Sequence, residues 1–350
     1  MPPFERKDGS GHSCSLFNLH YGQPIVLLAS AHPRRSFGDP ISQALLTQHP
    51  LWQRITRIAI LKTDIPGCAS LTRQYVVPFT MLADDGTLTS HLLGKSADQH
   101  TAALFALDNN LRVIRRWDAG SLPDAASVLR ELESVYGAPD EPQAVTIRGT
   151  APVLLIPRVF DEEFCAELIA AFERDGGQPS GVYYIENGQA TWKPDPTIKA
   201  RRDYYLPEED PLTNRIRDLL ARRVLPEVKR CFNYQILQHE PFKLIRYDGD
   251  TGGYFRPHRD NESRDSAHRR FAMTINLNTG DYEGGQLQFP EFGPYLYEAE
   301  RGGAIVFSCS LVHEAKPVIS GRRYALLSFF FGDEPVRQVV VRPQTSASLR

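Results

Sequence analysis

Short apolar runs alternate with more polar stretches over residues 1–137 of the chain. The apolar runs are of strand length and predict buried strands over 24–30, 55–62, 75–83 and 102–108. Residues 111–117 alternate apolar and basic side chains, which is typical of an exposed hairpin strand. Helices are predicted over 40–49 and 123–136, each opened by a proline, and the second is amphipathic. This order of strands and helices favours a three-layer α/β domain.

The pattern changes after residue 137. Residues 138–150 contain prolines and a glycine without apolar periodicity, and they predict a linker. Residues 151–173 then predict a strand and an amphipathic helix with Asp161 as its N-cap. A second helix is expected near 211–230, and beyond it the pattern predicts successive strands separated by Gly and Asp turns. The second domain, 151–342, is therefore expected to be β-rich with flanking helices.

Composition narrows the class of protein. Of 350 residues, 41% are hydrophobic and 23% are charged, as in an ordinary globular protein. The formal net charge of -2 gives no overall attraction to nucleic acid or to an anionic membrane. No run approaches the ~20 apolar residues of a membrane span, and the N-terminus lacks a signal-peptide core. A cytoplasmic protein with neither nucleic acid nor membrane among its partners is expected. The five cysteines are widely spaced and form no CxxC, so they predict buried thiols.

The segment that points to chemistry is His258-Arg259-Asp260. Side chains at i and i+2 of a strand point to the same face, so His258 and Asp260 are expected to project together. His313 follows His258 after 55 residues, enough for intervening strands to return the chain alongside. Two histidines and one carboxylate are the ligands of non-haem Fe(II) sites, which keep other positions open for an oxidant and a co-substrate. The three residues therefore predict such a metal site.

Arg323 adds a fourth element, ten residues after His313 and beyond a bend expected at Pro317 and Gly321. This spacing predicts His313 on one strand and Arg323 on the next, facing the same cavity. A guanidinium forms two parallel hydrogen bonds with a carboxylate, so Arg323 suits the far carboxylate of a dicarboxylic co-substrate. Strand alternation turns Arg322 to the opposite face.

These segments closely resemble the 2-oxoglutarate- and Fe(II)-dependent oxygenases, within them the prolyl-4-hydroxylase-like branch. The resemblance covers roughly residues 151–335. It rests on RYDGDTGGYFRPHRD (246–260), TINLNTGDYEGGQLQFPE (274–291) and HEAKPVISGRRYALLSF (313–329). It implies a double-stranded β-helix of the jelly-roll or cupin type, with the metal inside the mouth of the sheet.

The resemblance also implies roles for single residues. Its metal ligands correspond to His258, Asp260 and His313, and its anchor for the far carboxylate of 2-oxoglutarate corresponds to Arg323. Tyr247 is implied as a further hydrogen-bond donor to that carboxylate. Two cavity-facing contacts to co-substrate or substrate are also expected, Thr274 and Asn276, and Asn276 stands where relatives often carry tyrosine.

The function implied is that of a dioxygenase using Fe(II), 2-oxoglutarate and O2, with ascorbate as a further small molecule, to hydroxylate a substrate and release succinate and CO2. The substrate is left open among a protein residue, an amino acid and a small metabolite. Many collagen-type relatives carry Lys where Arg323 stands, so the resemblance gives no support to a collagen-like substrate. Residues 178–209 lie where relatives place a substrate-covering loop. They offer four candidate substrate contacts, with an exposed irregular loop as the alternative: Tyr183, Tyr184, Trp192 and Arg201.

The N-terminal domain resembles the thioredoxin-like fold and its peroxiredoxin branch over roughly residues 14–136. The resemblance rests on GQPIVLLAS (22–30) and FALDNNLRVIRRW (105–117). It breaks at the loop 31–38, which holds no cysteine where a peroxidase needs a thiolate. We therefore expect a redoxin fold without redoxin chemistry.

Two alternatives to an oxygenase stay open. One is a thiol peroxidase. The other is a non-catalytic protein whose redoxin-fold module binds a protein partner while the oxygenase domain senses a ligand or oxygen. In loop 31–38, the residues His32, Arg34 and Arg35 predict a solvated basic loop, with an anion site as the alternative. His239 and His268 fit no ligand spacing and are expected at the surface.

Overall fold

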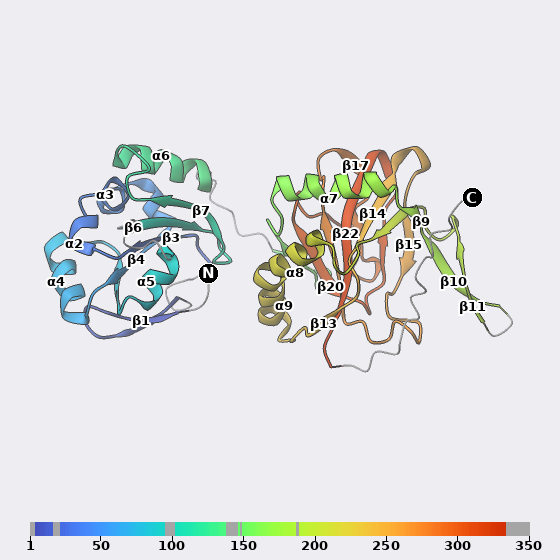
Figure 1. Ribbon diagram of the computed structural model, residues 1–350, viewed down its shortest axis with the longest axis horizontal. Helices are drawn as coiled ribbons and strands as arrows, with labels where there is room; N and C mark the ends of the chain where they lie inside the picture. Colours follow the sequence, from blue (N-terminus) through green and yellow to red (C-terminus); the bar gives the residue numbers. More distant parts are fainter. Residues whose placement is uncertain are drawn as a thin grey trace. The chain divides into compact units, whose positions relative to one another are not determined.

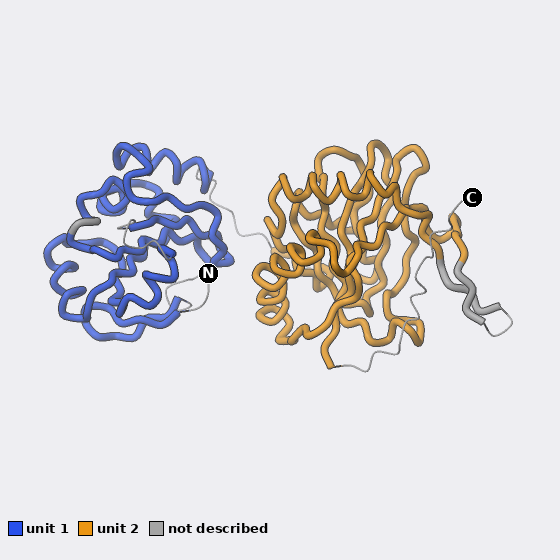
Figure 2. Tube along the Cα trace, viewed as in Figure 1, with its two compact units in different colours: residues 1–144 blue, residues 145–350 orange. Residues whose placement is uncertain are grey.

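Two units divide the chain, Met1–Ala144 and Val145–Arg350, and each encloses its own hydrophobic cores (Figure 2). Their boundary lies inside the predicted linker 138–150. The computed structural model describes residues 4–16, 22–94, 102–137, 146–147, 149–186 and 189–333; for 35–36, 182–186 and 189–192 it describes the backbone alone.

The first unit is built on a seven-stranded sheet with the order β2-β1-β5-β4-β3-β6-β7 (Figure 1). Strands β3, β4 and β5 pair in parallel, and the other pairs are antiparallel. The strands are β1 (Glu5–Asp8), β2 (Ser13–Ser15), β3 (Ile25–Ser30), β4 (Thr56–Lys62), β5 (Thr80–Asp84), β6 (Ala102–Leu107) and β7 (Val113–Asp118).

Helices cover both faces of this sheet, which explains why every residue of β3 and β6 is buried. Apolar side chains of α3 (Pro40–Leu46), α4 (Ile65–Tyr75) and α6 (Ala125–Tyr136) pack in one core, and those of α5 (Thr87–Leu93) pack in the core of the opposite face. This is the three-layer α/β arrangement that the sequence predicts. The likeness to thioredoxin-like proteins stays a prediction.

Three helices of this unit begin at an aspartate whose carboxylate accepts a backbone N–H of the first turn: Asp39, Asp64 and Asp124. The strand predicted over 75–83 was wrong in its first part, because α4 ends at Tyr75 and β5 begins only at Thr80. Part of the loop expected over 31–38 forms the short helix α2 (Pro33–Ser36), and η1 (Pro50–Gln53) precedes β4.

The second unit contains two larger antiparallel sheets. The first has the order β8-β20-β16-β22-β14-β12-β9, with β13 and β17 also pairing with β22, and the second has the order β15-β21-β18-β19. The strands of the first sheet are β8 (Leu154–Ile156), β9 (Gln178–Pro179), β12 (Arg202–Tyr205), β13 (Gln238–His239), β14 (Lys243–Asp248), β16 (Phe271–Asn276), β17 (Tyr282–Gly284), β20 (Ala304–Ser308) and β22 (Val318–Phe331). Those of the second are β15 (Phe255–His258), β18 (Leu287–Gln288), β19 (Leu296–Tyr297) and β21 (His313–Ala315).

Alternation along the strands separates two cores. Leu244 of β14 packs outward in the core shared with helix α7 (Glu162–Asp175), which crosses this face of the sheet (Figure 1). Its neighbour Ile245 packs inward in a core that also holds Leu287 and Ala315 of the second sheet. The unit is thus a pair of antiparallel sheets around an inner core, with helices on one outer face, as a jelly roll requires.

Two sequence expectations for this unit need correction. The single helix near 211–230 is divided into α8 (Pro211–Arg223) and α9 (Leu225–Phe232), because Pro226 removes a backbone donor and opens a new first turn. Residues 178–209 are not an irregular loop, since they include β9, β12 and the hairpin of β10 (Gly181–Glu186) and β11 (Gln189–Pro194). No helix of the described residues has the length and apolarity needed to cross a membrane.

Candidate active site

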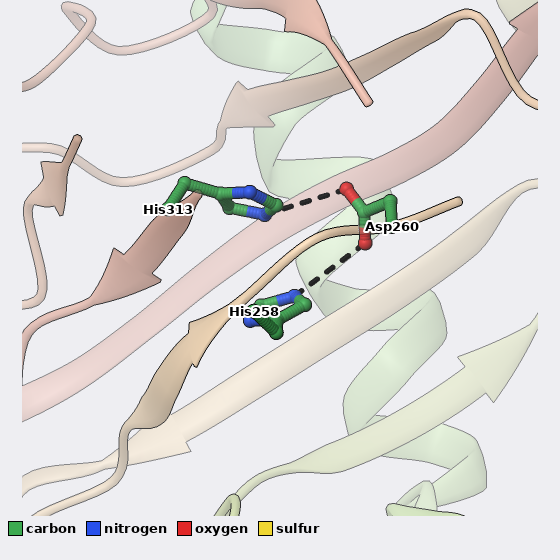
Figure 3. A group of neighbouring side chains, drawn as sticks. All are labelled: His258, Asp260 and His313. Carbon is green, nitrogen blue, oxygen red and sulfur yellow. Dashed lines mark ion pairs between the residues drawn. The ribbon is translucent and has the colours of Figure 1, made fainter. Parts of the chain in front are cut away.

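The predicted metal ligands converge between neighbouring strands of the second sheet. His258 ends β15 and pairs with His313, which begins β21, while Asp260 follows two residues after the end of β15. The Asp260 carboxylate lies between the imidazoles, with Oδ1 at 3.4 Å from His258 Nε2 and Oδ2 at 3.3 Å from His313 Nε2 (Figure 3). Each residue offers one ligand atom, and these three atoms all lie within 4.8 Å of one another. Two imidazole nitrogens and one carboxylate oxygen at this spacing fit a divalent transition metal.

Backbone carbonyls orient the two imidazoles. Nδ1 of His258 lies 2.7 Å from the Arg256 carbonyl, and Nδ1 of His313 lies 3.1 Å from the Leu311 carbonyl. When each Nδ1–H donates to its carbonyl, the Nε2 lone pair is left facing Asp260, which is the tautomer that a metal ligand needs.

The electrostatics of the site favour the protonation states that bind metal. Burial opposes ionisation of Asp260, but the charge that His313 carries when protonated, and then the hydrogen bond that a protonated His258 donates, outweigh burial and lower the pKa of Asp260 to about 2. Burial lowers the pKa of His313 despite the opposing charge of Asp260, which favours the neutral imidazole. An anionic carboxylate and a neutral imidazole bind a metal without first releasing a proton.

Hydrogen bonds also hold the backbone of Asp260. The Asp260 N–H donates to the Cys309 carbonyl at 3.0 Å, and the Asp260 carbonyl accepts from Arg269 Nη1 at 3.1 Å. Arg269 pairs with Glu240, whose Oε1 also lies 3.0 Å from His268 Nε2. The expectation of a surface position for His268 was therefore wrong: it is only 5% exposed because it packs between Glu240 and the ring of Phe331.

Arg323 lies on β22 opposite Tyr247 of β14, with its side chain in the interior and only 3% of the residue exposed. Its Nη2 donates to Asn276 Oδ1 at 2.9 Å, and its Cζ lies 5.5 Å from the centroid of the Tyr247 ring. Among the described residues, no carboxylate lies within ion-pair distance of Arg323. A buried guanidinium without a counter-ion is costly, so the site is suited to an anion such as the far carboxylate of 2-oxoglutarate.

The bend before Arg323 differs from the expected one. The chain turns at Lys316 and Pro317 between β21 and β22, whereas Gly321 lies inside β22. Its positive φ of 75° allows a close approach to β17, with which Gly321 pairs through Tyr282.

The other residues predicted for co-substrate binding also face this interior. Thr274 and Asn276 alternate with Ile275 on β16 and are almost fully buried. The Thr274 hydroxyl has no hydrogen-bond partner within the described chain. Tyr247 is buried as well, but its hydroxyl accepts from Arg201 Nη1 at 3.3 Å rather than from Arg323.

Sequence reasoning missed Tyr282, whose buried hydroxyl likewise has no partner among the described residues. Its ring packs against the inner core and lies close to Gly285, against which the Arg323 side chain also lies. The available signal was the place of Tyr282 just before the Gly284-Gly285 pair, which brings β17 against β22.

We predict that Gly285→Ala weakens the binding of 2-oxoglutarate by at least about tenfold, because small displacements of a positioning group are costly. A Cβ at Gly285 would lie 2.7 Å from Arg323 Cδ and 3.1 Å from Val318 Cγ2, so the guanidinium must move. Gly280→Ala is the matched control: Gly280 also has a positive φ, but a Cβ there meets nothing within 4 Å. Both variants carry backbone strain of roughly 1–2 kcal/mol. Equal 2-oxoglutarate dissociation constants in the two variants would contradict the prediction.

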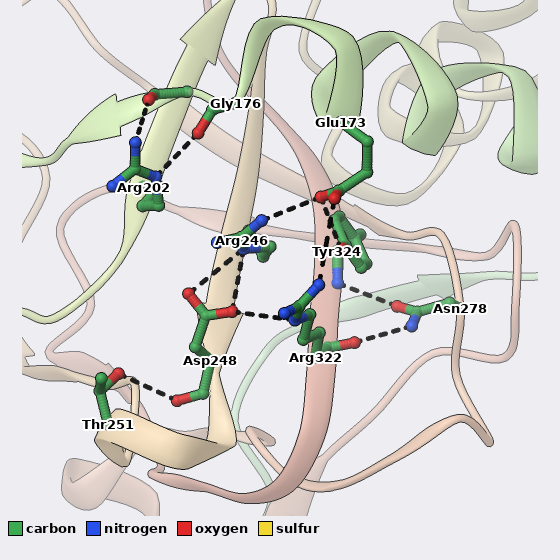
Figure 4. A network of polar contacts seen from close by, with 10 residues as sticks. Glu173, Gly176, Arg202, Arg246, Asp248, Thr251, Asn278, Arg322 and Tyr324 are labelled. Atoms are coloured by element: carbon green, nitrogen blue, oxygen red, sulfur yellow. Dashed lines mark hydrogen bonds and ion pairs between the residues drawn. The ribbon is translucent and has the colours of Figure 1, made fainter.

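The outward face of the same strands carries a separate polar network (Figure 4). Arg322 points toward α7, with its Nε 3.5 Å from Asp248 and Nη1 4.0 Å from Glu173. Asn278 holds this part of β22 by donating to the Arg322 carbonyl and accepting from the Tyr324 N–H. The alternation expected for Arg322 and Arg323 is confirmed, so Arg322 serves as a control position.

Of the four candidate substrate contacts, the structure describes the side chain of one. The side chains of Tyr183, Tyr184 and Trp192 lie outside the described residues, although their backbones form the hairpin of β10 and β11. Arg201 has a described side chain, which is only 6% exposed and pairs with Asp203 at 2.8 Å. It lies inside the unit rather than on an exposed loop.

The thiols of the first unit do not resemble peroxidatic cysteines. Cys68 is fully buried, and burial raises the pKa of its thiol to about 11, while burial also raises the pKa of Cys14. The thiolate that peroxide reduction needs is therefore disfavoured at both cysteines.

The basic residues of segment 31–38 are described only in part. Arg34 is exposed, and the side chain of Arg35 lies outside the described residues. His32 has further polar or ring contacts and is not a free group.

We predict that Cys14→Ser and Cys68→Ser leave 2-oxoglutarate turnover unchanged, and that the parent protein does not consume peroxide at a rate dependent on either thiol. Turnover and peroxide consumption are measured on the same preparations. Loss of turnover in a folded variant would reveal redox chemistry in the first unit.

Comparison with known proteins agrees with this geometry. Residues 242–331 match the family model of the 2OG-Fe(II) oxygenase superfamily. A PKHD-type hydroxylase of Shewanella sp. (strain MR-7) is 29% identical over 181 residues, covering 49% of this chain and 74% of the relative. A PKHD-type hydroxylase of Stenotrophomonas maltophilia (strain R551-3) is 30% identical over 156 residues, covering 41% and 65%. A solved Pseudomonas putida prolyl-4-hydroxylase has 18% identity and a TM-score of 0.41, covering 52% of this chain and 93% of that one. The family match over residues 242–331 and the hydroxylase relatives indicate that the second unit carries a 2OG-Fe(II) oxygenase domain with hydroxylase homologues.

Proposed function

We propose that the protein is an Fe(II)- and 2-oxoglutarate-dependent dioxygenase that hydroxylates an organic substrate and forms succinate and CO2. The observation that carries the proposal has two parts. The ligand atoms of His258, Asp260 and His313 lie together, and the buried Arg323, on the inner face of the same unit, has no carboxylate partner among the described residues. The hydroxylase homologues support the reaction type.

The protein's own residues hold the reactants in this proposal. His258, Asp260 and His313 would hold iron through three positions, leaving the others for ligands that react. Arg323 would bind the far carboxylate of 2-oxoglutarate, and Asn276 fixes its guanidinium from the neighbouring strand. Bound iron and 2-oxoglutarate supply the activation of O2 and the oxidation of a C–H bond. The apolar rings of Phe289 and Phe307 pack beside His313 and shield this side of the site from bulk water.

The proposal is tested by loading the purified protein anaerobically with Fe(II) and 2-oxoglutarate, admitting O2 and measuring succinate with and without a chelator. Succinate that depends on iron and on 2-oxoglutarate is expected, with higher rates for members of a substrate panel. Binding of 2-oxoglutarate without any succinate would favour the sensing alternative, and thiol-dependent peroxide consumption would favour the peroxidase. Ascorbate use, a cytoplasmic location and a protein partner of the first unit stay predictions.

A further inference from the structure

A group of charged side chains lies inside the second unit beside the metal ligands. It consists of Arg201, Asp203 and Lys243, from the chain before β12, from β12 and from β14. The two Arg201–Asp203 contacts measure 2.8 and 3.2 Å, and Lys243 Nζ lies 3.9 Å from Asp203 Oδ2. The side chains are only 6%, 10% and 13% exposed, so their charges are poorly screened by solvent.

Lys199 adds a third cation to this group and connects it to the metal ligands. Its backbone forms a bridge with Phe255, and its Nζ lies 5.1 Å from the centroid of the Phe255 ring. The Phe255 ring stacks on the imidazole of His258, with centroids 3.5 Å apart. Arg201 lies over the same ring, with its Cζ 5.3 Å from the centroid. One aromatic ring thus separates both cations from a metal ligand.

The ammonium of Lys199 has no carboxylate within ion-pair distance in the part of the chain that the structure describes. Burial, and then the charges of Arg201 and Lys243, lower its pKa to about 7, while Asp203 and Asp260 act in the opposite direction. The ordinary pKa of a lysine is near 10.4. Its position beside Arg201 disfavours the protonated form, so an additional anion at this place would stabilise the ammonium.

The formal charges of the metal centre and of the neighbouring group of basic residues can be compared. If the proposed function holds, a divalent metal and Arg323 carry three positive charges, and Asp260 with the 2-oxoglutarate dianion carries three negative ones. The metal centre is then neutral. The neighbouring group has three basic side chains, Lys199, Arg201 and Lys243, against the single carboxylate of Asp203, and the pKa of about 7 leaves Lys199 only partly protonated near pH 7. An excess of positive charge in a poorly solvated place is unfavourable unless an anion joins it.

We propose that Lys199 and Arg201 bind a carboxylate of the substrate to be oxidised, so that the substrate class is an organic acid or an acidic peptide. This inference rests on the proposed function and deepens it. Arg201 contributes a guanidinium held by Asp203 and by the Tyr247 hydroxyl, and Lys199 contributes an amine that has no ion-pair partner among the described residues. A substrate held there by its carboxylate would lie beside the Phe255 ring, which stacks on the metal ligand His258.

The test uses protein loaded with Zn(II) and saturating 2-oxoglutarate, so that binding is measured without turnover. Isothermal calorimetry compares N-acetylglycine with its neutral amide. A second pair, acetyl-Gly-Asp-Gly-amide and acetyl-Gly-Asn-Gly-amide, asks whether the carboxylate comes from a small acid or from a peptide side chain. We expect at least one carboxylate to bind about tenfold more tightly than its neutral partner, as loss of a partly buried charge pair implies.

Lys199→Met keeps the alkyl stem over Phe255 and removes only the charge. It should reduce the affinity for the carboxylate probe to that of the neutral probe and leave the neutral probe and 2-oxoglutarate unaffected. Lys199→Arg should recover most of the affinity, and Lys229→Met, at an exposed position of α9, should change nothing. Arg201 is left intact because its removal would strand the buried Asp203.

Two results would overturn the inference: equal or absent binding of the acids and their neutral partners, or full carboxylate affinity in folded Lys199→Met. If the parent protein failed to bind 2-oxoglutarate in the presence of metal, the proposed function would fail instead. The titration of 2-oxoglutarate into the metal-loaded protein separates the two failures.

Discussion

Alanine at any one of His258, Asp260 and His313 is expected to lower metal affinity by at least about 100-fold and to abolish 2-oxoglutarate turnover. Loss of an outer partner of a metal ligand already costs about 10–100-fold, and loss of one of three ligands removes a direct bond. Removing Asp260 also leaves two imidazoles, 4.3 Å apart by ring centroid, without the carboxylate between them. Metal content after dialysis and succinate formation measure the two effects.

His12→Ala is the matched control for the histidine variants. His12 lies in the first unit with 81% of its side chain exposed, so metal content and turnover should stay at the parent level. Circular dichroism separates a lost ligand from a lost fold, which matters for His313 because it packs against Phe289 and Phe307. A folded variant that kept full metal affinity would remove its residue from the ligand set.

The metal ligands could be predicted because their signals are local. His258 and Asp260 are two residues apart, and His313 lies between two apolar runs of strand type, 304–308 and 324–331. Arg323 follows from strand alternation in the same way, since Arg322 and Arg323 must face opposite sides. The structure brings all four to one interior, and their roles in binding stay predictions until tested.

What the sequence did not reveal depends on contacts between distant segments. The N-cap Asp64 and the first residues of α4, Ile65 to Gly67, resemble a turn in the sequence. The segment is helical because Cys68 and Leu71 pack in the core of the first unit. His268 is buried through a pairing with Glu240, 28 residues earlier in the chain. No periodicity within a short window indicates such a partner.

The group around Lys199 illustrates the same limit. In the sequence, Lys199 and Arg201 belong to a polar segment that resembles an exposed loop. The pairing of β12 with β14 turns Asp203 and Lys243 to one face, and the bridge to Phe255 carries Lys199 to the metal ligands. The proposed carboxylate site thus depends on strand pairing that composition and spacing do not reveal.

Arg323→Ala is expected to raise the dissociation constant of 2-oxoglutarate by about 30- to several-thousand-fold. The substitution removes a charge-assisted pair with the far carboxylate in a site from which water is largely excluded. Truncating one partner of such a buried pair is typically worth roughly 2–5 kcal/mol, which gives this range. Titration of 2-oxoglutarate into the anaerobic Fe(II) protein, followed by the absorption of the chelate, measures the constant.

Arg323→Lys should recover part of the affinity, because the charge is kept while the planar fork that matches a carboxylate is lost. Arg322→Ala is the neighbouring control: its side chain is 55% exposed on the opposite face, near Asp248 and Glu173, so the constant should stay at the parent value. Arg323 is also buried against Asn276 and Tyr247, and alanine there leaves a cavity that lowers stability whatever its role. A purely structural role would lower the unfolding temperature of both Arg323 variants while the dissociation constant in folded protein stayed unchanged. That outcome would exclude Arg323 as the carboxylate anchor, whereas a weakened constant in a folded variant separates binding from stability.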